Sequence, residues 1–591
     1  MNVNEVLNFR LERGNKRKIL DVPQKDAKEK KKRDRPPKEE KPDEVDNFLK
    51  KILKKQEPGI QQPARPAVEK AEEKRAPQLT KETEMSEAER EKILAAVETH
   101  QEEETIDASY VKRTILAFEK KVTKNSEMRI KFPDHPVKFM ESELDLHDEL
   151  QRMHILATVP QYYPIIVKLN AVNTLLGLIT HENTDISIAV VDLLQEMTDV
   201  ENVSDDDEET DQLFDALLES QVVAVLVQNL DRLDESHKDE ADGVHNSLAI
   251  IENLAEFRSE TCGLAGEQGL IGWLLKRIKV KGFDANKLYT SEILAIMLQN
   301  NDGNRETVGD LNGVDILLQA LAYYKRHDPT SSEEIEYMEN LFNCLCSSLL
   351  HSGNKELFLK GEGLQLMILM LREKKMSRCS SLKVLDFAMT GPDGGDNCNK
   401  FIEILGLRSI FPLFMKPPKK NKKIGNGPDV AEEHTSSIIA SLFRHSVGSS
   451  RSRLVQKFVE NDHIKVDRLM ELYFNYRSKV QDADMKIEKE KDELEEKGDV
   501  IDESLEDSFY LRRLDAGLFT LQLTVCVIME ACCSGVSSIK SRVMQVLTQH
   551  GGSPKDVKEI MREYASHVGD SDTNESAELE KRRLLSLVDR F

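Results

Sequence analysis

The sequence predicts an all-α fold, an armadillo or HEAT type right-handed helical solenoid with helical caps at both ends and a disordered N-terminal arm. Three observations support this prediction. Helix-opening apolar residues recur at spacings of 43 to 50 residues, no segment has a convincing strand pattern, and the first hundred or so residues contain few core-forming side chains. Helices that recur with a period of about 40 to 50 residues are typical of armadillo and HEAT repeats.

The recurrence extends from about residue 170 to residue 415. Each copy opens with an apolar residue followed by apolar partners three and four positions later, which is the pattern of a half-buried helix. The six opening residues are Val172, Val222, Leu270, Val314, Leu364 and Leu407. Glycine directly precedes four of them, at Gly269, Gly313, Gly363 and Gly406, and we expect it to permit a tight turn into the helix.

Three copies share a further layout before that glycine. An asparagine opens it at Asn304, Asn354 and Asn397, and an apolar residue follows four positions later at Val308, Phe358 and Phe401. This layout predicts a polar turn and a short apolar hook under the next helix, so that the repeat is helix, turn, helix. A set of unrelated helical hairpins does not account for the shared pattern. Another amphipathic helix is expected upstream in each copy, at residues 186–197, 244–257, 288–298, 338–350, 382–389 and 438–443.

Residues 1–105 are predicted to form a disordered arm. They hold 25 basic and 24 acidic side chains with few aromatic residues, so they cannot bury enough apolar surface to offset the entropy of ordering. Two basic clusters in the arm resemble a bipartite nuclear-import signal, because an extended peptide can place them in two acidic pockets of a carrier. The alternative is a charged linker with chance clusters. The clusters are Lys16, Arg17 and Lys18, then Lys30, Lys31, Lys32 and Arg33.

The rest of the chain is divided by its apolar pattern. We expect an N-terminal helical cap at 106–168, armadillo-like repeats at 169–460, a charged helix and linker at 461–503, and a C-terminal helical cap at 504–591. No signal peptide or membrane span is expected. The most apolar stretch, 514–533, is interrupted by Asp515 and Glu530, which leaves too few uncharged residues to cross a bilayer.

Sequence patterns for catalysis or metal binding are thin. The eight cysteines are scattered without any Cys-x-x-Cys pair, and none of the fourteen histidines lies in a His-Glu-x-x-His arrangement. Such cysteine usage is typical of a reduced, intracellular protein. We therefore expect no enzyme activity, catalytic residue, cofactor or metal site, although an enzyme whose residues meet only in space remains an alternative.

The charge is distributed unevenly. Residues 106–591 carry 58 basic and 82 acidic side chains, a net charge of −24. A body so acidic repels phosphate backbones, which argues against direct nucleic-acid binding and favours partners with basic segments. The alternative interpretation is that the acidity only keeps a long solenoid soluble.

Several long runs resemble the beta-catenin-like family of armadillo-repeat proteins, from residue 106 to the end of the chain. They include 129–146 (RIKFPDHPVKFMESELDL), 183–196 (NTDISIAVVDLLQE) and 509–519 (FYLRRLDAGLF). The resemblance implies a nuclear scaffold associated with the spliceosome and pre-mRNA splicing, within the assembly of a ubiquitin-ligase-type splicing factor and a Myb-like cell-division-cycle partner. It also implies recognition of basic nuclear-localisation segments of partners, including a deaminase in vertebrates.

The expected binding mechanism uses a groove lined by the third helices of successive repeats. Acidic side chains around this groove would hold an extended basic peptide. Each exposed pair contributes only about 0.2 to 1 kcal/mol, so several must act together. The candidate residues are Asp192, Glu196, Asp231, Asp234, Glu235, Glu252 and Glu256.

Two other classes of armadillo protein are alternatives. An import adaptor of the importin-alpha kind uses a Trp and an Asn one turn apart in each repeat, whereas this chain has only Trp273, with Arg277 one turn later. A catenin-type scaffold would instead be found at cell junctions. The sequence leaves open which partner binds which face, whether the chain self-associates, and whether the arm folds back onto the groove.

Overall fold

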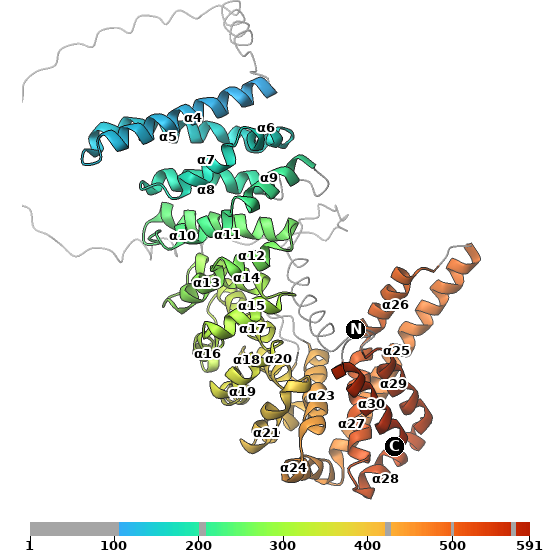
Figure 1. Cartoon of the computed structure of the whole chain (residues 1–591). Coiled ribbons are helices and arrows are strands. Elements are labelled where there is room, and N and C mark those ends of the chain that lie inside the picture. Colours follow the sequence, from blue (N-terminus) through green and yellow to red (C-terminus); the bar gives the residue numbers. More distant parts are fainter. Residues whose placement is uncertain (1–105, 200–207, 420–426, 498–500, 569–574) are drawn as a thin grey trace, which may run out of the picture. The chain divides into compact units, whose positions relative to one another are not determined.

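A computed structural model describes residues 106–199, 208–419, 427–497, 501–568 and 575–591 (Figure 1). The arm, with the two basic clusters at residues 16–18 and 30–33, lies outside the described residues. Within the described ranges every regular element is a helix, and no strand occurs. The prediction of an all-α helical solenoid is therefore confirmed.

The repeats contain three helices each, not two. The short apolar hook predicted from the sequence is itself a helix in α15, α18 and α21, so the helix, turn, helix repeat was wrong in this respect. The five complete repeats are α9 (Glu208–Glu219), α10 (Val222–Leu230), α11 (Lys238–Phe257); α12 (Thr261–Glu267), α13 (Leu270–Lys279), α14 (Ala285–Met297); α15 (Asp302–Asp310), α16 (Gly313–Ala322), η3 (Tyr323–Lys325), α17 (Ser332–Ser348); α18 (Ser352–Lys360), α19 (Gly363–Arg372), α20 (Arg378–Met389); and η4 (Pro392–Gly394), α21 (Gly395–Glu403), α22 (Leu407–Met415), α23 (Pro428–His445).

Helices at both ends extend this series. The N-terminal elements are α4 (Ala108–Lys131), α5 (Pro136–Met153), η1 (His154–Thr158), η2 (Pro160–Tyr162), α6 (Tyr163–Lys168), α7 (Ala171–Ile179) and α8 (Thr184–Thr198). The C-terminal elements are α24 (Gly448–Val459), α25 (Ile464–Lys497), α26 (Glu503–Asp515), α27 (Leu518–Cys532), α28 (Ser537–Gln549), α29 (Pro554–Ser566) and α30 (Glu575–Arg590).

The third helices of the repeats pack on one another in chain order. We call α5, α8, α11, α14, α17, α20 and α23 the third-helix stack, because α5 packs on α8 as α8 packs on α11. Neighbours in the stack are parallel. Asn183, at the start of α8, donates to Glu143 near the middle of α5, and Glu196 near the end of α8 contacts His154 just after α5. One side of every helix in the stack is thus presented in the same direction.

The asparagine that recurs at one position in three repeats has a structural role. The Asn354 side-chain amide is buried and donates to two carbonyls of the preceding repeat, Ser348 O at the end of α17, at 2.9 Å, and Arg305 O in α15, at 2.7 Å. Asn304 donates in the same way to Met297 O and Cys262 O. Each amide therefore satisfies a carbonyl at the end of a third helix and fixes the register between repeats.

Glycine before the second helix acts mainly through its small size. A Cβ at Gly363 would lie 2.3 Å from the ring of Phe358, and one at Gly406 would lie 2.6 Å from the ring of Phe401. The left-handed conformation instead belongs to the preceding residue, for example Glu362 at a φ of 59°. Of the four glycines only Gly269 has a positive φ, at 95°. Glycine therefore permits the turn through its conformation at that position and through its size at Gly363 and Gly406.

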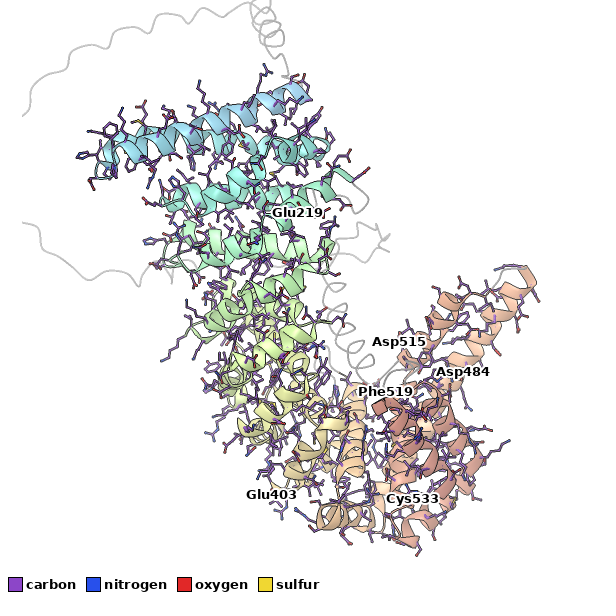
Figure 2. The ribbon with its side chains drawn as sticks, viewed as in Figure 1. Glu219, Glu403, Asp484, Asp515, Phe519 and Cys533 are labelled. Atoms are coloured by element: carbon purple, nitrogen blue, oxygen red, sulfur yellow. The ribbon has the colours of Figure 1, made fainter. Side chains whose placement is uncertain are left out.

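The C-terminal helices pack along the last helix of the third-helix stack. α27 lies against α23 on one side and against α25 on another. Phe519 and Cys533 mark the two ends of α27 in Figure 2. Every residue of α27 except Phe519 is buried, which agrees with the sequence interpretation of this apolar stretch as a buried helix.

No single helix in the described ranges combines the length and apolar composition needed to cross a bilayer. Three neighbouring pairs reach that length and composition only when joined, and each pair is bent by 60° or more. Across the same residues, no three His, Cys, Asp or Glu side chains gather closely enough to hold a metal ion.

Candidate partner-binding surface

The exposed side of the third-helix stack is acidic in its N-terminal part. On α8 and α11, carboxylates recur on the side opposite the buried apolar positions. We call these residues, with those of α14 and α17, the acidic face; they are Asp192, Glu196, Asp242, Glu252, Glu256, Glu292, Glu336 and Glu339. The four helices contain only two Lys or Arg residues, Lys238 and Lys287. Lys287 is buried and donates to the carbonyls of Val280 and Gly282, so it does not neutralise this face.

Asp192 of α8 lies close enough to Glu196 of α8 and Asp242 of α11 for their charges to act on it. Its half-buried side chain accepts a hydrogen bond from the amide of Asn246, at 2.8 Å. Burial raises the pKa of Asp192 above its ordinary value, and the neighbouring Glu196 and Asp242 raise the pKa further. Because these carboxylates repel one another, a basic side chain of a partner would stabilise their charged forms.

Glu252 and Glu256 extend the acidic face along α11. Glu252 accepts a hydrogen bond from the hydroxyl of Tyr289 on α14, and burial together with that carboxylate raises the pKa of the Tyr289 hydroxyl. The Tyr289 ring packs on His245, with 4.6 Å between ring centroids. Glu256, one turn after Glu252, is exposed and forms no ion pair with the residues described. The face thus offers both fixed and unpaired carboxylates.

The structure places three of the predicted candidates elsewhere. Asp231, Asp234 and Glu235 lie in the loop after α10 rather than on the acidic face. Asp231 pairs with Lys276 at 2.6 Å, and Glu235 holds the buried guanidinium of Arg277 through contacts of 2.6 and 2.9 Å. These pairs join α13 to the preceding repeat, so their charges are largely used within the fold.

Asp192, Glu196, Glu252 and Glu256 are the predicted candidates that share one face. Sequence reasoning missed Asp242, Glu292, Glu336 and Glu339, although each could have been found by continuing the helical register of the third helices. The sequence also contained a sign that Asp231 and Glu235 form ion pairs within the fold, because the basic residues Lys276 and Arg277 follow them by about one repeat. Trp273 is buried in α13, a second helix, and takes no part in the acidic face.

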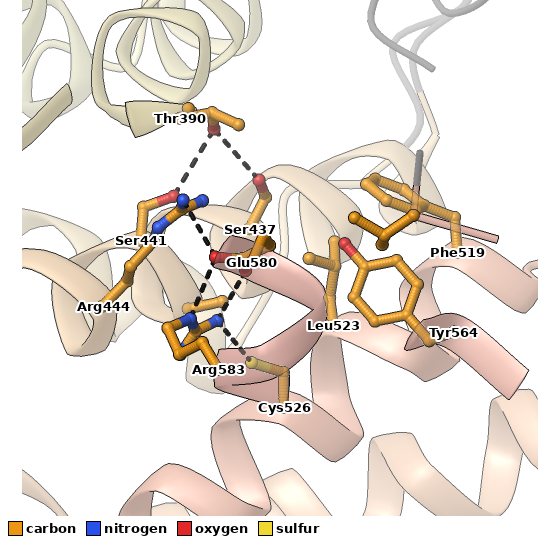
Figure 3. Close-up of a pocket in the computed structure, with 13 residues that line it drawn as sticks. Thr390, Ser437, Ser441, Arg444, Phe519, Leu523, Cys526, Tyr564, Glu580 and Arg583 are labelled. Carbon is orange, nitrogen blue, oxygen red and sulfur yellow. Dashed lines mark hydrogen bonds and ion pairs between the residues drawn. The ribbon is translucent and has the colours of Figure 1, made fainter. Parts of the chain in front are cut away.

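The C-terminal part of the third-helix stack is covered by other helices. Figure 3 shows Arg583 of α30 beside Glu580, and the two side chains lie 2.8 Å apart. Arg583 also reaches Glu530 of α27 at 2.6 Å. Arg444 of α23 pairs with Glu580 at 2.9 Å, and Arg451 pairs with Glu530 at 2.8 Å. The cavity between these helices holds only about 60 Å³. It has room for water molecules but not for a peptide.

Comparison with known proteins places these features in a family. A family described as "Catenin-beta-like, Arm-motif containing nuclear" matches residues 89–562. Beta-catenin-like protein 1 from Bos taurus is 59% identical over 487 residues, which cover 82% of this chain and 86% of that protein. The Homo sapiens protein of the same name is 58% identical over the same length. The beta-catenin-like protein 1 homolog of Schizosaccharomyces pombe is 35% identical over 491 residues, covering 82% of this chain and 83% of that protein. The residues matched by the family, 89–562, include the whole acidic face.

Proposed function

Because the chain belongs to the family of catenin-beta-like, Arm-motif-containing nuclear proteins, we propose that it is a scaffold that binds basic nuclear-localisation-type segments of partners on its acidic face. The partners are proteins of the pre-mRNA splicing machinery, and the site of action is the nucleus. The armadillo fold and the names of the relatives point to a repeat scaffold rather than an enzyme. The observation that carries the proposal is the row of carboxylates on α8, α11, α14 and α17, four helices whose own basic side chains are only Lys238 and the buried Lys287.

The spacing of the helices suits an extended peptide. Packed helices lie about 8 to 10 Å apart, and an extended chain advances about 3.3 Å per residue. A peptide running across the stack therefore meets a new helix about every third residue. Each exposed ion pair contributes about 0.2 to 1 kcal/mol, so a useful affinity requires several Lys or Arg residues and weakens in salt.

Charge reversal tests the binding. Glu196→Lys with Glu256→Lys replaces two attractions by repulsions, and we expect a fluorescent Lys/Arg-rich peptide to bind about tenfold more weakly. The matched control is Glu306→Lys with Glu356→Lys, which makes the same change of net charge on exposed residues of α15 and α18. Fluorescence anisotropy at two salt concentrations separates the two variants. Equal loss in both would show that only the overall charge matters, and the acidic face would not be the site.

Association with splicing proteins needs a separate measurement. Proximity labelling in nuclei, with the full chain and with the Glu196→Lys, Glu256→Lys variant, should show splicing factors with basic segments lost in the variant. The control variant should retain them. An unchanged set of labelled proteins would contradict the proposed route of recruitment.

A further inference from the structure

An apolar stripe lies next to the acidic face on α5. Val137, Met140 and Leu144 follow one another at the three- and four-residue spacing of a helix side. Their exposed fractions are 81%, 55% and 60%, whereas Phe139 and Leu146 on the other side of α5 are buried. Large apolar side chains exposed together on one helix side indicate a surface that is covered by a partner. We call these three residues the α5 stripe.

The α5 stripe is continuous with the acidic face. Gln151 and His154 continue the same side of the helix after Leu144, and His154 Nδ1 lies 2.7 Å from Glu196 Oε2. Glu143, on the flank of α5 toward α8, accepts from Asn183 at 3.1 Å. Asp145, on the opposite flank, pairs with Lys121 and Lys124 of α4. The α5 stripe therefore lies between these flanks, on the side that α8 presents with Asp192.

We propose that the α5 stripe is the apolar part of the partner site, and that the bound segment carries a large apolar side chain beside its Lys/Arg cluster. The inference rests on the proposed function and extends it to the sequence pattern of the ligand. A basic segment alone would leave Met140 and Leu144 exposed. A segment with both kinds of side chain matches the surface in charge and in apolar contact.

The geometry sets the spacing of that pattern. α8 is one helix away from α5, and α11 is two helices away. With about 8 to 10 Å between packed helices and about 3.3 Å per extended residue, the apolar side chain lies about three residues from the basic residue at Asp192. It lies about six residues from the basic residue at Glu252 or Glu256. Acidic residues within this span would be repelled by the face.

Peptides in pairs test the proposal on the full chain. One peptide of each pair carries Leu six residues from the centre of a Lys/Arg cluster, the other carries Ser there, and both chain directions are synthesised. We expect the Leu peptide of one direction to bind about tenfold more tightly than its Ser partner, since a large apolar side chain is buried. Equal binding of Leu and Ser peptides in both directions would overturn the proposal.

A variant of the protein completes the cycle. Met140→Ser with Leu144→Ser changes only exposed side chains, so the fold is retained, and circular dichroism and thermal unfolding check this. The variant should abolish the advantage of the Leu peptide and leave the Ser peptide unchanged. Glu196→Lys with Glu256→Lys should instead weaken both peptides.

The outcomes separate the role of the α5 stripe from the role of the acidic face. If the charge variant weakens both peptides but the serine variant changes neither, the α5 stripe is not part of the site, while the proposed function stands. If the charge variant changes neither peptide, the proposed function fails. A dimer that the serine variant dissociates in analytical ultracentrifugation would assign the stripe to a second copy. A crosslink between position 140 and residues 1–105 in the full chain would assign it to the arm, and either result would overturn the proposal.

Discussion

Two helices of the third-helix stack, α8 and α23, occupy the same place in their repeats but have different surroundings. On α8 the polar side is open, and Asp192 has one amide as its hydrogen-bond donor. On α23 the corresponding side is covered, and the buried Glu432 receives the guanidinium of Arg468 and, at 2.8 Å, the hydroxyl of Tyr476. The chain thus supplies counter-charges where its own helices cover the stack. On the acidic face, the four helices α8, α11, α14 and α17 contribute only Lys238 and the buried Lys287 as basic side chains of their own.

The largest expected effect is at the covered end. Arg583→Met removes the partner shared by Glu580 and Glu530, whose side chains are only 9% and 7% exposed. The substitution leaves each buried carboxylate with a single arginine partner, Arg444 or Arg451, and we expect the free energy of unfolding to fall by about 3 kcal/mol. Chemical denaturation measures the change.

The neighbouring residue on α30 provides the control. Arg582 is exposed and pairs only with Glu578 one turn before it, so Arg582→Met should change the free energy of unfolding by about 0.5 kcal/mol or less. Similar losses in the two variants would show that the covering helices are not held by the buried charges. The contrast between the open and the covered ends would then need another cause.

A smaller loss of stability is expected from the asparagine contact that recurs between repeats. Asn354→Ala leaves the carbonyls of Ser348 and Arg305 without their side-chain donor inside the core, at a cost of about 2 kcal/mol. The control is Asn399→Ala, because the half-buried Asn399 donates to Gly395 O within its own helix and forms no hydrogen bond to another repeat among the described residues. Thermal unfolding of the two variants compares them. If Asn399→Ala destabilises as much, the inter-repeat bonds are not special.

Much of the fold was predictable because it follows from local pattern. The spacing of Val314, Leu364 and Leu407 indicated the second helices. Asn304, Asn354 and Asn397 marked a repeated segment, which was predicted as a turn and an apolar hook and is a short first helix in the structure. The size of glycine was not predictable in the same way, because its neighbour is the ring of Phe358 or Phe401, which only the folded turn brings close. The charge on the chain indicated an acidic surface but not its location.

The site was partly predictable for a related reason. Asp192, Glu196, Glu252 and Glu256 lie on helices whose register can be read from apolar periodicity. Asp231 and Glu235 lie in a loop, where no periodicity says which way a side chain points. Their partners Lys276 and Arg277 come from the next repeat. Likewise, the covering of α23 depends on Arg468 and Arg583, which are distant in sequence and carry no local signal.

The smallest expected effect is at Asp192 on α8, where the acidic face is exposed. Burial raises the pKa of Asp192 in the folded chain, so the folded state holds its proton more tightly than the unfolded state does. The contribution of this carboxyl to stability therefore falls as the pH rises through the interval from its ordinary pKa to the raised value, and the full penalty is present above that interval. Asp192→Asn keeps an acceptor for Asn246 and removes the penalty. At neutral pH the variant should be at least as stable as the parent chain, and at acidic pH below the interval the difference should vanish.

The same substitution should weaken a basic peptide about two- to fivefold at neutral pH, the value of one ion pair. Parent affinity should fall as the pH decreases toward the raised pKa of Asp192, whereas the affinity of the Asp192→Asn variant should fall less. Anisotropy titrations at several pH values, with unfolding curves under the same conditions, check both halves. A carboxylate kept for structure would behave in the opposite way, since its loss would lower stability and leave binding intact. Covered residues such as Glu432 are expected to follow that second pattern, because their counter-charges lie within the chain.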